Sequence, residues 1–174
     1  MHETEFLEFC TKSRYDVSAL SLFERGVTFA KRYLSGKKRL AGDSYFDHNV
    51  RVAKLLAESR ASPEIIAAGL LHGVLKECLS SEVEREFGKE IAQLVLEQNN
   101  VQELKFKNKE LEAEALRKLI LTTLRDVRVV IVKLANKVDN LRTIEVLPSE
   151  EQQRIAHETL EIYAPLAYRL GVEN

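Results

Sequence analysis

The sequence contains few of the residues that cross-link or interrupt a fold. Its 174 residues include two cysteines, Cys10 and Cys78, which are too few for a disulfide framework and fit a reducing compartment. Seven glycines and three prolines leave few breaks, so helices joined by short loops are favoured. No apolar run is long enough to span a bilayer, and residues 1–5 lack the basic and then apolar pattern of a signal peptide. These absences predict a cytoplasmic, all-α protein without membrane contact.

An excess of charge of either sign is also missing. The chain has 26 lysines and arginines against 27 aspartates and glutamates, which gives a formal net charge of -1. Such a balance provides no general attraction to nucleic acid or to an anionic membrane, so no direct DNA binding is expected. Hydrophobic residues make up 45% and charged residues 30%, as in a soluble globular protein. We expect one domain over residues 1–174, large enough for a sizeable core.

Apolar residues recur at helical spacing along most of the chain. The predicted helices cover residues 5–10, 20–34, 43–59, 62–72, 81–88, 91–98, 108–122, 127–146 and a last stretch from 149, which Pro165 breaks. The segment 97–109 is polar and aperiodic, and we interpret it as a mobile loop. The segment 65–77 contains the most apolar helix, so it is expected in the middle of the core, with His72 where that helix ends.

Most of the common catalytic signatures are absent. The sequence has no glycine-rich phosphate loop, no dinucleotide-binding glycine pattern, no Cys-x-x-Cys pair and no His-Glu-x-x-His motif. What is present is His48 near the start of one helix, His72 at the end of the next, and a polar segment, 136–143, on a central helix. Each histidine is either a hydrogen-bonded core residue or a metal ligand.

Residues 35–43, Ser-Gly-Lys-Lys-Arg-Leu-Ala-Gly-Asp, are predicted to form a basic loop bounded by glycines. This is the one local cluster of positive charge in the sequence. It is either a solvated surface loop or a contact for an anion or a nucleotide phosphate, since the planar guanidinium of Arg39 suits such groups.

Four blocks of sequence together resemble one family. Three of them are Tyr45-x-x-His48-x-x-x-Val52-Ala53, Ile66-Ala67-Ala68-x-Leu70-Leu71-His72 and Asp126-x-Arg128-Val129-x-x-x-Lys133-Leu134-Ala135. The fourth, Glu158 to Gly171, reads Glu-Thr-Leu-Glu-Ile-Tyr-Ala-Pro-Leu-Ala-Tyr-Arg-Leu-Gly and is the most specific. From roughly Phe23 to Val172 the chain resembles the N-terminal HD-type hydrolase domain of the RelA/SpoT alarmone synthetase/hydrolase family. The resemblance implies a compact, all-helical HD-domain bundle.

The resemblance also implies a metal centre. In active members, Mn²⁺ is held by a His, a His-Asp pair and a later Asp, and it activates water to remove the 3′-diphosphate of guanosine tetra- or pentaphosphate. Residue by residue, the two histidines correspond to His48 and His72. The Asp of the pair is Gly73 here, which has no side chain to donate, and the later Asp is Asn136, a neutral and weaker ligand.

The acidic pair that helps to position the attacking water in active hydrolases is altered too. Its places are held by Lys76 and Glu77, and the lysine adds a positive charge beside a would-be cation. With both carboxylate ligands and half of this pair lost, we interpret the metal centre as defunct. No catalytic residue and no cofactor are therefore expected, and His48 and His72 are vestigial.

One replacement ligand deserves consideration. Asp139 lies on the same helix face as the altered carboxylate position 136, three residues further on. Together with Asp47 or Glu77 it could rebuild the site, and Mn²⁺ is then the expected cofactor. The alternative is that Asp139 pairs with Lys137, Arg142 or water at an exposed edge.

The nucleotide side of the site departs less from the family pattern. The resemblance places Arg39 where the family stacks an arginine near the guanine, and Asn140 and Thr143 in the segment that contacts the nucleotide. The ligand expected there is guanosine tetra- or pentaphosphate, or GTP or GDP. Leu40 stands where the family has a lysine or arginine, and this departure argues against tight phosphate binding. Asn140 and Thr143 are alternatively polar groups of helix surface or packing.

These observations predict a catalytically silent HD domain with a regulatory role in (p)ppGpp metabolism, the stringent response. Because the sequence ends at Gly171-Val172-Glu173-Asn174, where a synthetase domain begins in relatives, we expect a longer protein with a (p)ppGpp synthetase in cis. One alternative is a metal-dependent (p)ppGpp 3′-pyrophosphohydrolase with a rebuilt metal site. A second is an interaction scaffold that binds neither metal nor nucleotide.

Overall fold

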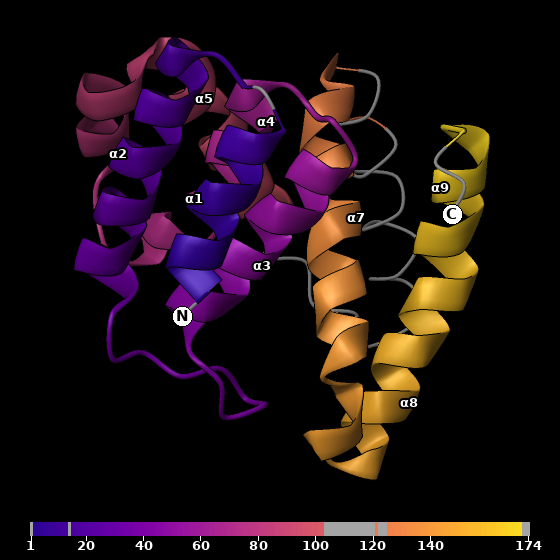
Figure 1. Ribbon diagram of the computed structural model, residues 1–174. Coiled ribbons are helices and arrows are strands. Elements are labelled where there is room, and N and C mark those ends of the chain that lie inside the picture. The colour runs from indigo at the N-terminus through magenta and orange to yellow at the C-terminus, as the bar shows by residue number, and fades with distance from the viewer. Residues whose placement is uncertain (1, 14, 103–120, 122–124, 172–174) are drawn as a thin grey trace.

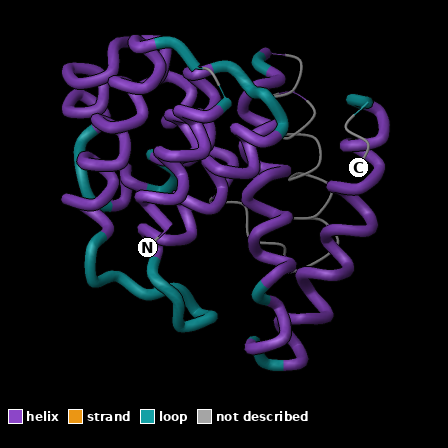
Figure 2. Tube along the Cα trace, in the orientation of Figure 1, coloured by secondary structure: helices purple, strands orange, loops and turns teal. Residues whose placement is uncertain are grey.

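The described part of the chain is helical apart from its connecting loops. The computed structural model describes residues 2–13, 15–102, 121 and 125–171. Within these residues there is no β-strand, and one isolated bridge joins Lys38 to Ser44 (Figures 1 and 2). The predicted all-α fold class is confirmed. None of the described helices has the length and apolar character that crossing a bilayer requires.

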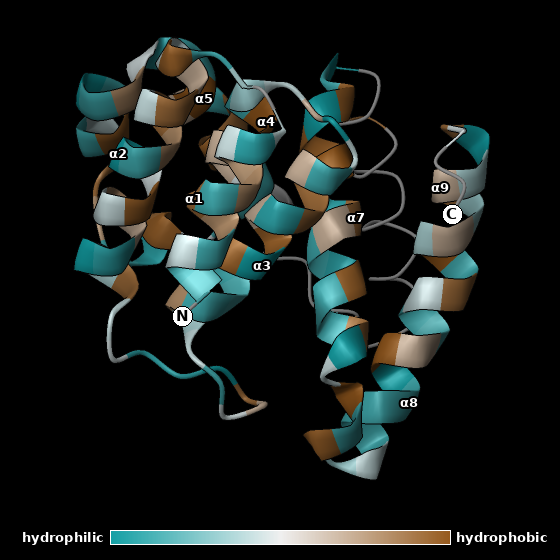
Figure 3. Cartoon of the chain, viewed as in Figure 1, coloured by the Kyte–Doolittle hydropathy of each residue, from teal (hydrophilic) through white to brown (hydrophobic). Residues whose placement is uncertain are grey.

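Apart from the loop 35–44, the connections that the structure describes between consecutive elements are short. In chain order they are α1 (His2–Lys12), α2 (Val17–Leu34), α3 (Tyr45–Glu58), α4 (Pro63–Leu70), the 3₁₀ turn η1 (Val74–Lys76), α5 (Ser80–Gln102), α7 (Val127–Arg142), the 3₁₀ turn η2 (Ile144–Val146), α8 (Ser149–Glu158), the π-helical turn η3 (Thr159–Tyr163) and α9 (Ala164–Arg169). Most helices carry both hydrophilic and hydrophobic faces, and the hydrophobic faces supply the core (Figure 3).

Local sequence explains where the first helices begin. The Asp16 carboxylate accepts a hydrogen bond from the Ala19 amide at 2.7 Å and so caps α2. The Ser44 hydroxyl does the same for α3 through the Asp47 amide, and Pro63 occupies the first position of α4. These caps satisfy amide groups that have no partner inside the helix.

Helix α4 lies in the middle of the bundle, where it contacts α2, α3, α5 and α7. All of its residues from Ile65 to Leu70 are buried, as the sequence predicts. Close approach is possible because small residues line the contacts. A Cβ at Gly69 would lie 2.7 Å from the Leu56 side chain, and one at Gly26 would lie 2.9 Å from Leu70.

Three predicted helix ends are wrong, and two of them are those of α4 and α5. Helix α4 ends at Leu70 rather than near His72, because the chain turns there and Gly73 takes a left-handed conformation with φ of 73°. Helix α5 continues to Gln102, so the polar loop predicted from residue 97 is wrong over residues 97–102. The predicted break at Gly88 is confirmed as a kink inside α5, with φ of 81°.

Other predictions fall outside the described residues. The remainder of the polar loop, 103–109, and most of the helix predicted over 108–122 lie there. The sequence also predicts Asp126 as the cap of the helix from residue 127, and this is confirmed, since its carboxylate accepts from the Arg128 amide at 3.0 Å. Helix α7 ends at Arg142, however, and residues 144–146 form a separate 3₁₀ turn.

The C-terminal helices pack along α7 (Figure 1). Val130 of α7 and Ile162 of η3 form a small second core, and the partly buried residues packed against it are Leu134, Tyr163, Leu166 and Leu170. The predicted break near Pro165 takes the form of a π-helical turn just before it, in which the Ala164 amide donates to the Thr159 carbonyl. A wide turn accommodates a proline that cannot donate a hydrogen bond.

Candidate functional site

The candidate site lies where the basic loop, α3, the turn after α4 and α7 come together. The loop 35–44 is closed by backbone hydrogen bonds, in which the Arg39 amide donates to the Asp43 carbonyl at 2.8 Å and the Tyr45 amide donates to the Lys37 carbonyl at 3.0 Å. Figure 2 shows it as the long loop between α2 and α3. This closure holds Arg39 near the first turns of α3, from which His48 projects into the core.

His48 and Asp139 form a buried pair. The His48 Nδ1 lies 2.6 Å from an Asp139 carboxylate oxygen, and both side chains are almost fully buried. Burial alone would raise the pKa of Asp139, but hydrogen bonds from His48 and Arg51 outweigh it and lower the pKa. Burial lowers the pKa of His48, so the ring is neutral near pH 7. Because ionised Asp139 only accepts, the His48 Nδ1 is the nitrogen that carries the proton.

Two arginines surround the same carboxylate. Arg51 donates to both Asp139 oxygens, with distances of 2.8 and 2.9 Å, and also donates to Asp43 at 2.5 Å. Arg39 donates to both Asp43 oxygens and lies 3.8 Å from Asp139. Arg39, Asp43, Arg51 and Asp139 thus alternate in charge around a closed ring, which we call the ionic ring.

The position of Asp139 corrects one prediction. Its side chain is completely buried, and its partners are His48 and Arg51 rather than Lys137, Arg142 or water at an exposed edge. Asp139 lies three residues after Asn136 on a helix that crosses the core. Its side chain therefore points inward rather than to solvent.

Arg39, Asn140 and Thr143, the three predicted nucleotide-binding residues, lie close together but bind protein groups. The Arg39 guanidinium donates to the Asn140 side-chain oxygen at 2.5 Å, and only 12% of the Arg39 side chain is exposed. The Thr143 hydroxyl donates to the carbonyls of Asp139 and Asn140 at 3.5 and 3.3 Å. A nucleotide could engage Arg39 only by replacing these contacts.

His72 lies in the turn between α4 and η1. The buried Asn49 side chain fixes this turn, because its amide donates to the carbonyls of Leu70 and His72 at 2.8 and 2.7 Å. The His72 ring lies edge-on to that of His48, with a centroid distance of 6.0 Å and an interplanar angle of 66°. Burial first, and then the charges of His48, Lys133 and Lys76, lower the pKa of His72 to about 3. His72 is therefore a neutral imidazole at physiological pH.

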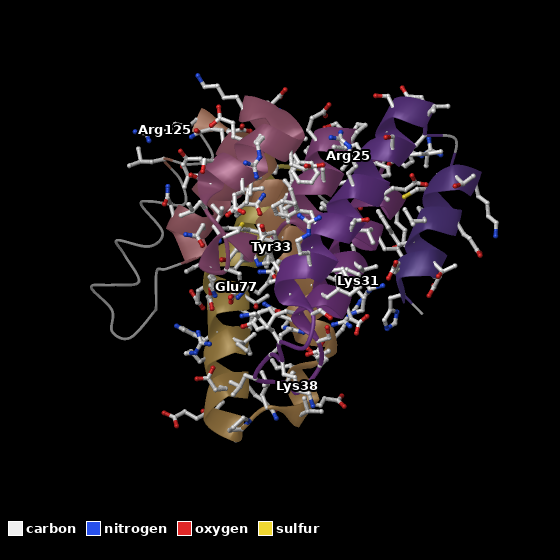
Figure 4. All side chains as sticks on the ribbon, turned by 90° about the vertical axis from the view of Figure 1, so that its left-hand side faces the viewer. Arg25, Lys31, Tyr33, Lys38, Glu77 and Arg125 are labelled. Carbon is white, nitrogen blue, oxygen red and sulfur yellow. The ribbon has the colours of Figure 1, made fainter. Side chains whose placement is uncertain are left out.

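The four positions that differ from the pattern of active hydrolases, residues 73, 76, 77 and 136, lie around this turn and on α7. The backbone of Gly73 has the left-handed conformation, and a Cβ added there would point into open space. Lys76 and Glu77 are exposed, and Glu77 forms an ion pair with Lys37 of the basic loop. Glu77 directly follows η1, which contacts α2, and Figure 4 labels Glu77 on the same side of the molecule as Tyr33 of α2. Asn136 is half-buried on α7.

The residues present do not fit a Mn²⁺ ion. Manganese prefers carboxylate, carbonyl and water oxygens, and imidazoles complete its shell. Here Gly73 has no donor, Asn136 is neutral, and both oxygens of Asp139 already accept from Arg51. Within the part of the chain that the structure describes, no three His, Cys, Asp or Glu side chains are grouped so as to hold a metal ion.

Comparison with known proteins shows the family of this domain. Residues 26–173 match the HD-domain family. The chain belongs to this family. Its HD domain is of the RelA/SpoT type, because the relatives that it matches over most of its length are proteins of that kind, at 36% to 43% identity.

Three relatives of this HD domain show the range of functions. It is 43% identical over 142 residues to guanosine-3′,5′-bis(diphosphate) 3′-pyrophosphohydrolase of Vibrio cholerae and 42% identical over 142 residues to the bifunctional (p)ppGpp synthase/hydrolase SpoT of Escherichia coli. Each match covers 80% of the chain and 20% of the relative. The GTP pyrophosphokinase rsh of Brucella ovis is 36% identical over 177 residues, which cover 100% of the chain and 24% of that protein. The HD domain spans about a fifth to a quarter of the length of these curated relatives.

Sequence reasoning missed several residues of the site. Arg51 and Asn49 stand beside His48 in the sequence, and Asp43 ends the basic loop, but none belongs to a catalytic motif. Gln98, which is buried and opposes the fall in the pKa of the His72 ring, was placed only at the edge of a predicted loop. The one available signal was the charge of Arg51 one turn after His48, on the same helix face.

Proposed function

We propose that this HD domain is catalytically silent and has a regulatory role in (p)ppGpp metabolism. The observation that carries the proposal is that no free carboxylate occupies the positions of the family's acidic metal ligands. Gly73 and Asn136 supply no carboxylate, and the carboxylate of Asp139 is bound by Arg51 and His48. A site that neither holds a cation nor positions water through acids has lost the means of activating water for attack on phosphorus.

Guanine-nucleotide binding is the second part of the proposal. Arg39 and Asn140 lie within hydrogen-bond distance of each other, so the residues expected to meet the nucleotide are already in one place. A phosphate or a guanine would compete with Asp43 and Asn140 for the Arg39 guanidinium. Because these contacts must open first, the affinity for the nucleotide is lowered by the free energy that opening them costs. We therefore expect weak binding that does not depend on metal.

The proposed partner is a (p)ppGpp synthetase domain in the same polypeptide. Support comes from the relatives named GTP pyrophosphokinase, of which the matched region is about a fifth to a quarter. A silent domain packed against a synthetase regulates it if it binds the active and inactive states with different affinity. Joined to such a synthetase, residues 1–174 are expected to change its rate of (p)ppGpp synthesis. Equal rates with and without them would contradict the regulatory role.

The second candidate function is a (p)ppGpp 3′-pyrophosphohydrolase with a rebuilt metal site. It is favoured by one observation: the two imidazoles are neighbours with ring centroids 6.0 Å apart, and Asp139 orients His48 through Nδ1, as outer carboxylates orient metal-binding histidines. Against it stand the positive charges of Arg39 and Arg51 at His48 and of Lys76 and Lys133 at His72.

Calorimetry with guanosine tetraphosphate, with and without Mn²⁺, separates these functions when pyrophosphate release is assayed in the same samples. Metal-independent binding without release is the expected result. Release that requires Mn²⁺ would establish the hydrolase instead, and the absence of binding would leave an interaction scaffold. Arg39→Gln should weaken binding by about tenfold or more, whereas Arg32→Gln, an exposed arginine of α2, should leave it unchanged.

A further inference from the structure

The ionic ring joins three parts of the fold that are distant in the sequence. Arg39 and Asp43 belong to the loop 35–44, Arg51 to α3, and Asp139 to α7. Arg51 is the central member, since it donates to Asp43 at 2.5 Å and to Asp139 at 2.8 and 2.9 Å. Its guanidinium therefore connects the loop and α7 through one rigid, planar group.

The charges of the ring cancel. Two guanidinium groups face two carboxylates in four ion pairs. Asp139 is completely buried, and an unpaired carboxylate there would be strongly destabilising. The cation that makes its burial possible is therefore part of the protein.

We propose that Arg51 acts as a built-in cation, which braces the loop 35–44 and α7 against α3 and makes the folded state of the domain independent of a metal ion. The ring also keeps Arg39 and Asp43 engaged with each other in the absence of a ligand. The inference concerns stability and metal dependence, so it does not require the proposed role in (p)ppGpp metabolism to be correct.

Thermal unfolding of the 174-residue chain, in EDTA and in excess Mn²⁺, tests the proposal. The wild-type Tm should be the same in both to within about 1 °C. Arg51→Gln leaves Asp139 buried without its main partner and should lower the Tm by at least about 5 °C. The matched control is Lys54→Gln on the same helix, whose ion pair with Glu5 is exposed and should be worth about 2 °C or less.

The double variant Arg51→Gln/Asp139→Asn distinguishes a charge pair from general packing. Because it removes both charges, it should recover at least half of the loss in Tm caused by Arg51→Gln alone. Three results would each overturn the proposal: a wild-type Tm that rises with Mn²⁺ or falls with EDTA, an Arg51→Gln effect no larger than that of Lys54→Gln, or a double variant whose losses simply add.

A second measurement tests the proposal even if the Arg51→Gln variant does not fold. Asp43→Asn removes one link of the ring from the partly exposed loop and leaves Arg51 on Asp139. Amide hydrogen exchange should then become faster in residues 35–44 but not in α2. Unchanged exchange in the loop would contradict the bracing role.

Discussion

At the scale of single residues, charges inside this domain occur in compensated groups. Lys137 of α7 is buried, and its ammonium lies 3.2 Å from Glu158 of α8 and 4.5 Å from the ring centre of Tyr163. Burial lowers the pKa of Lys137, although Glu158 opposes the shift. Burial and the charge of Glu158 also raise the pKa of Tyr163. This group attaches the C-terminal helices to α7 in the way the ionic ring attaches the loop.

The Lys137–Glu158 pair gives a prediction at this scale. Glu158→Gln removes the charge that compensates a buried ammonium, and it should lower the free energy of unfolding by on the order of 3 kcal/mol. Urea unfolding measures the change. Replacing both residues, as in Lys137→Met/Glu158→Leu, should cost clearly less, because no buried charge is left unpaired. A double variant less stable than Glu158→Gln would show that packing, not charge, dominates here.

At the scale of the element, caps decide where helices begin, while contacts with the rest of the fold decide where some of them end. Asp16 and Asp126 cap the helices that follow them, and only Asp126 was predicted as a cap from the sequence. The end of α4 was not readable, because the turn after Leu70 is held by Asn49 from a different helix. Periodicity carries no information about such a partner.

The cap of α2 is testable by itself. Asp16→Ala removes the acceptor of the Ala19 amide and should lower the free energy of unfolding by about 1 kcal/mol. Ser18→Ala, an exposed change in the first turn of the same helix, is the matched control and should have little effect. Urea unfolding measures the stability of both variants. Equal values for the two would contradict the capping role of Asp16.

At the scale of the whole molecule, stability should fall in acid, because carboxylates in separate places are held ionised by arginines. Hydrogen bonds with Arg128 lower the pKa of Asp126. At Asp43, burial would raise the pKa, but Arg51 and Arg39 outweigh it and lower the pKa. A pKa that is lower in the folded state contributes stability above the unfolded value, near 4 for an aspartate, and this contribution is lost as the pH falls through the folded value.

The corresponding measurement is the difference in Tm between the wild type and Asp126→Asn as a function of pH. The difference should be constant at neutral pH and shrink as the pH falls below about 4, where the wild type loses the contribution of this carboxylate. Glu150→Gln, at an exposed acid of α8, should show no such trend. A difference between wild type and Asp126→Asn that persists unchanged in strong acid would contradict the assignment.

The sequence by itself determined the helical class, the central position of the apolar helix α4 and the family to which the domain belongs. Periodicity, caps and short motifs are local properties, so they can be read along the chain. The sequence also singled out His48, His72 and Asp139 as residues of the site. The exposed edge considered for Asp139 was wrong, because its side chain is buried.

Only the tertiary structure decided what these residues do together. Arg39, Arg51 and Asp139 are separated by up to 100 residues (39 to 139), and no local pattern pairs them. Their pairing depends on how α3 and α7 pack and on a buried carboxylate that must find a cation nearby. That requirement, which acts through space rather than along the chain, makes an arginine the partner of Asp139.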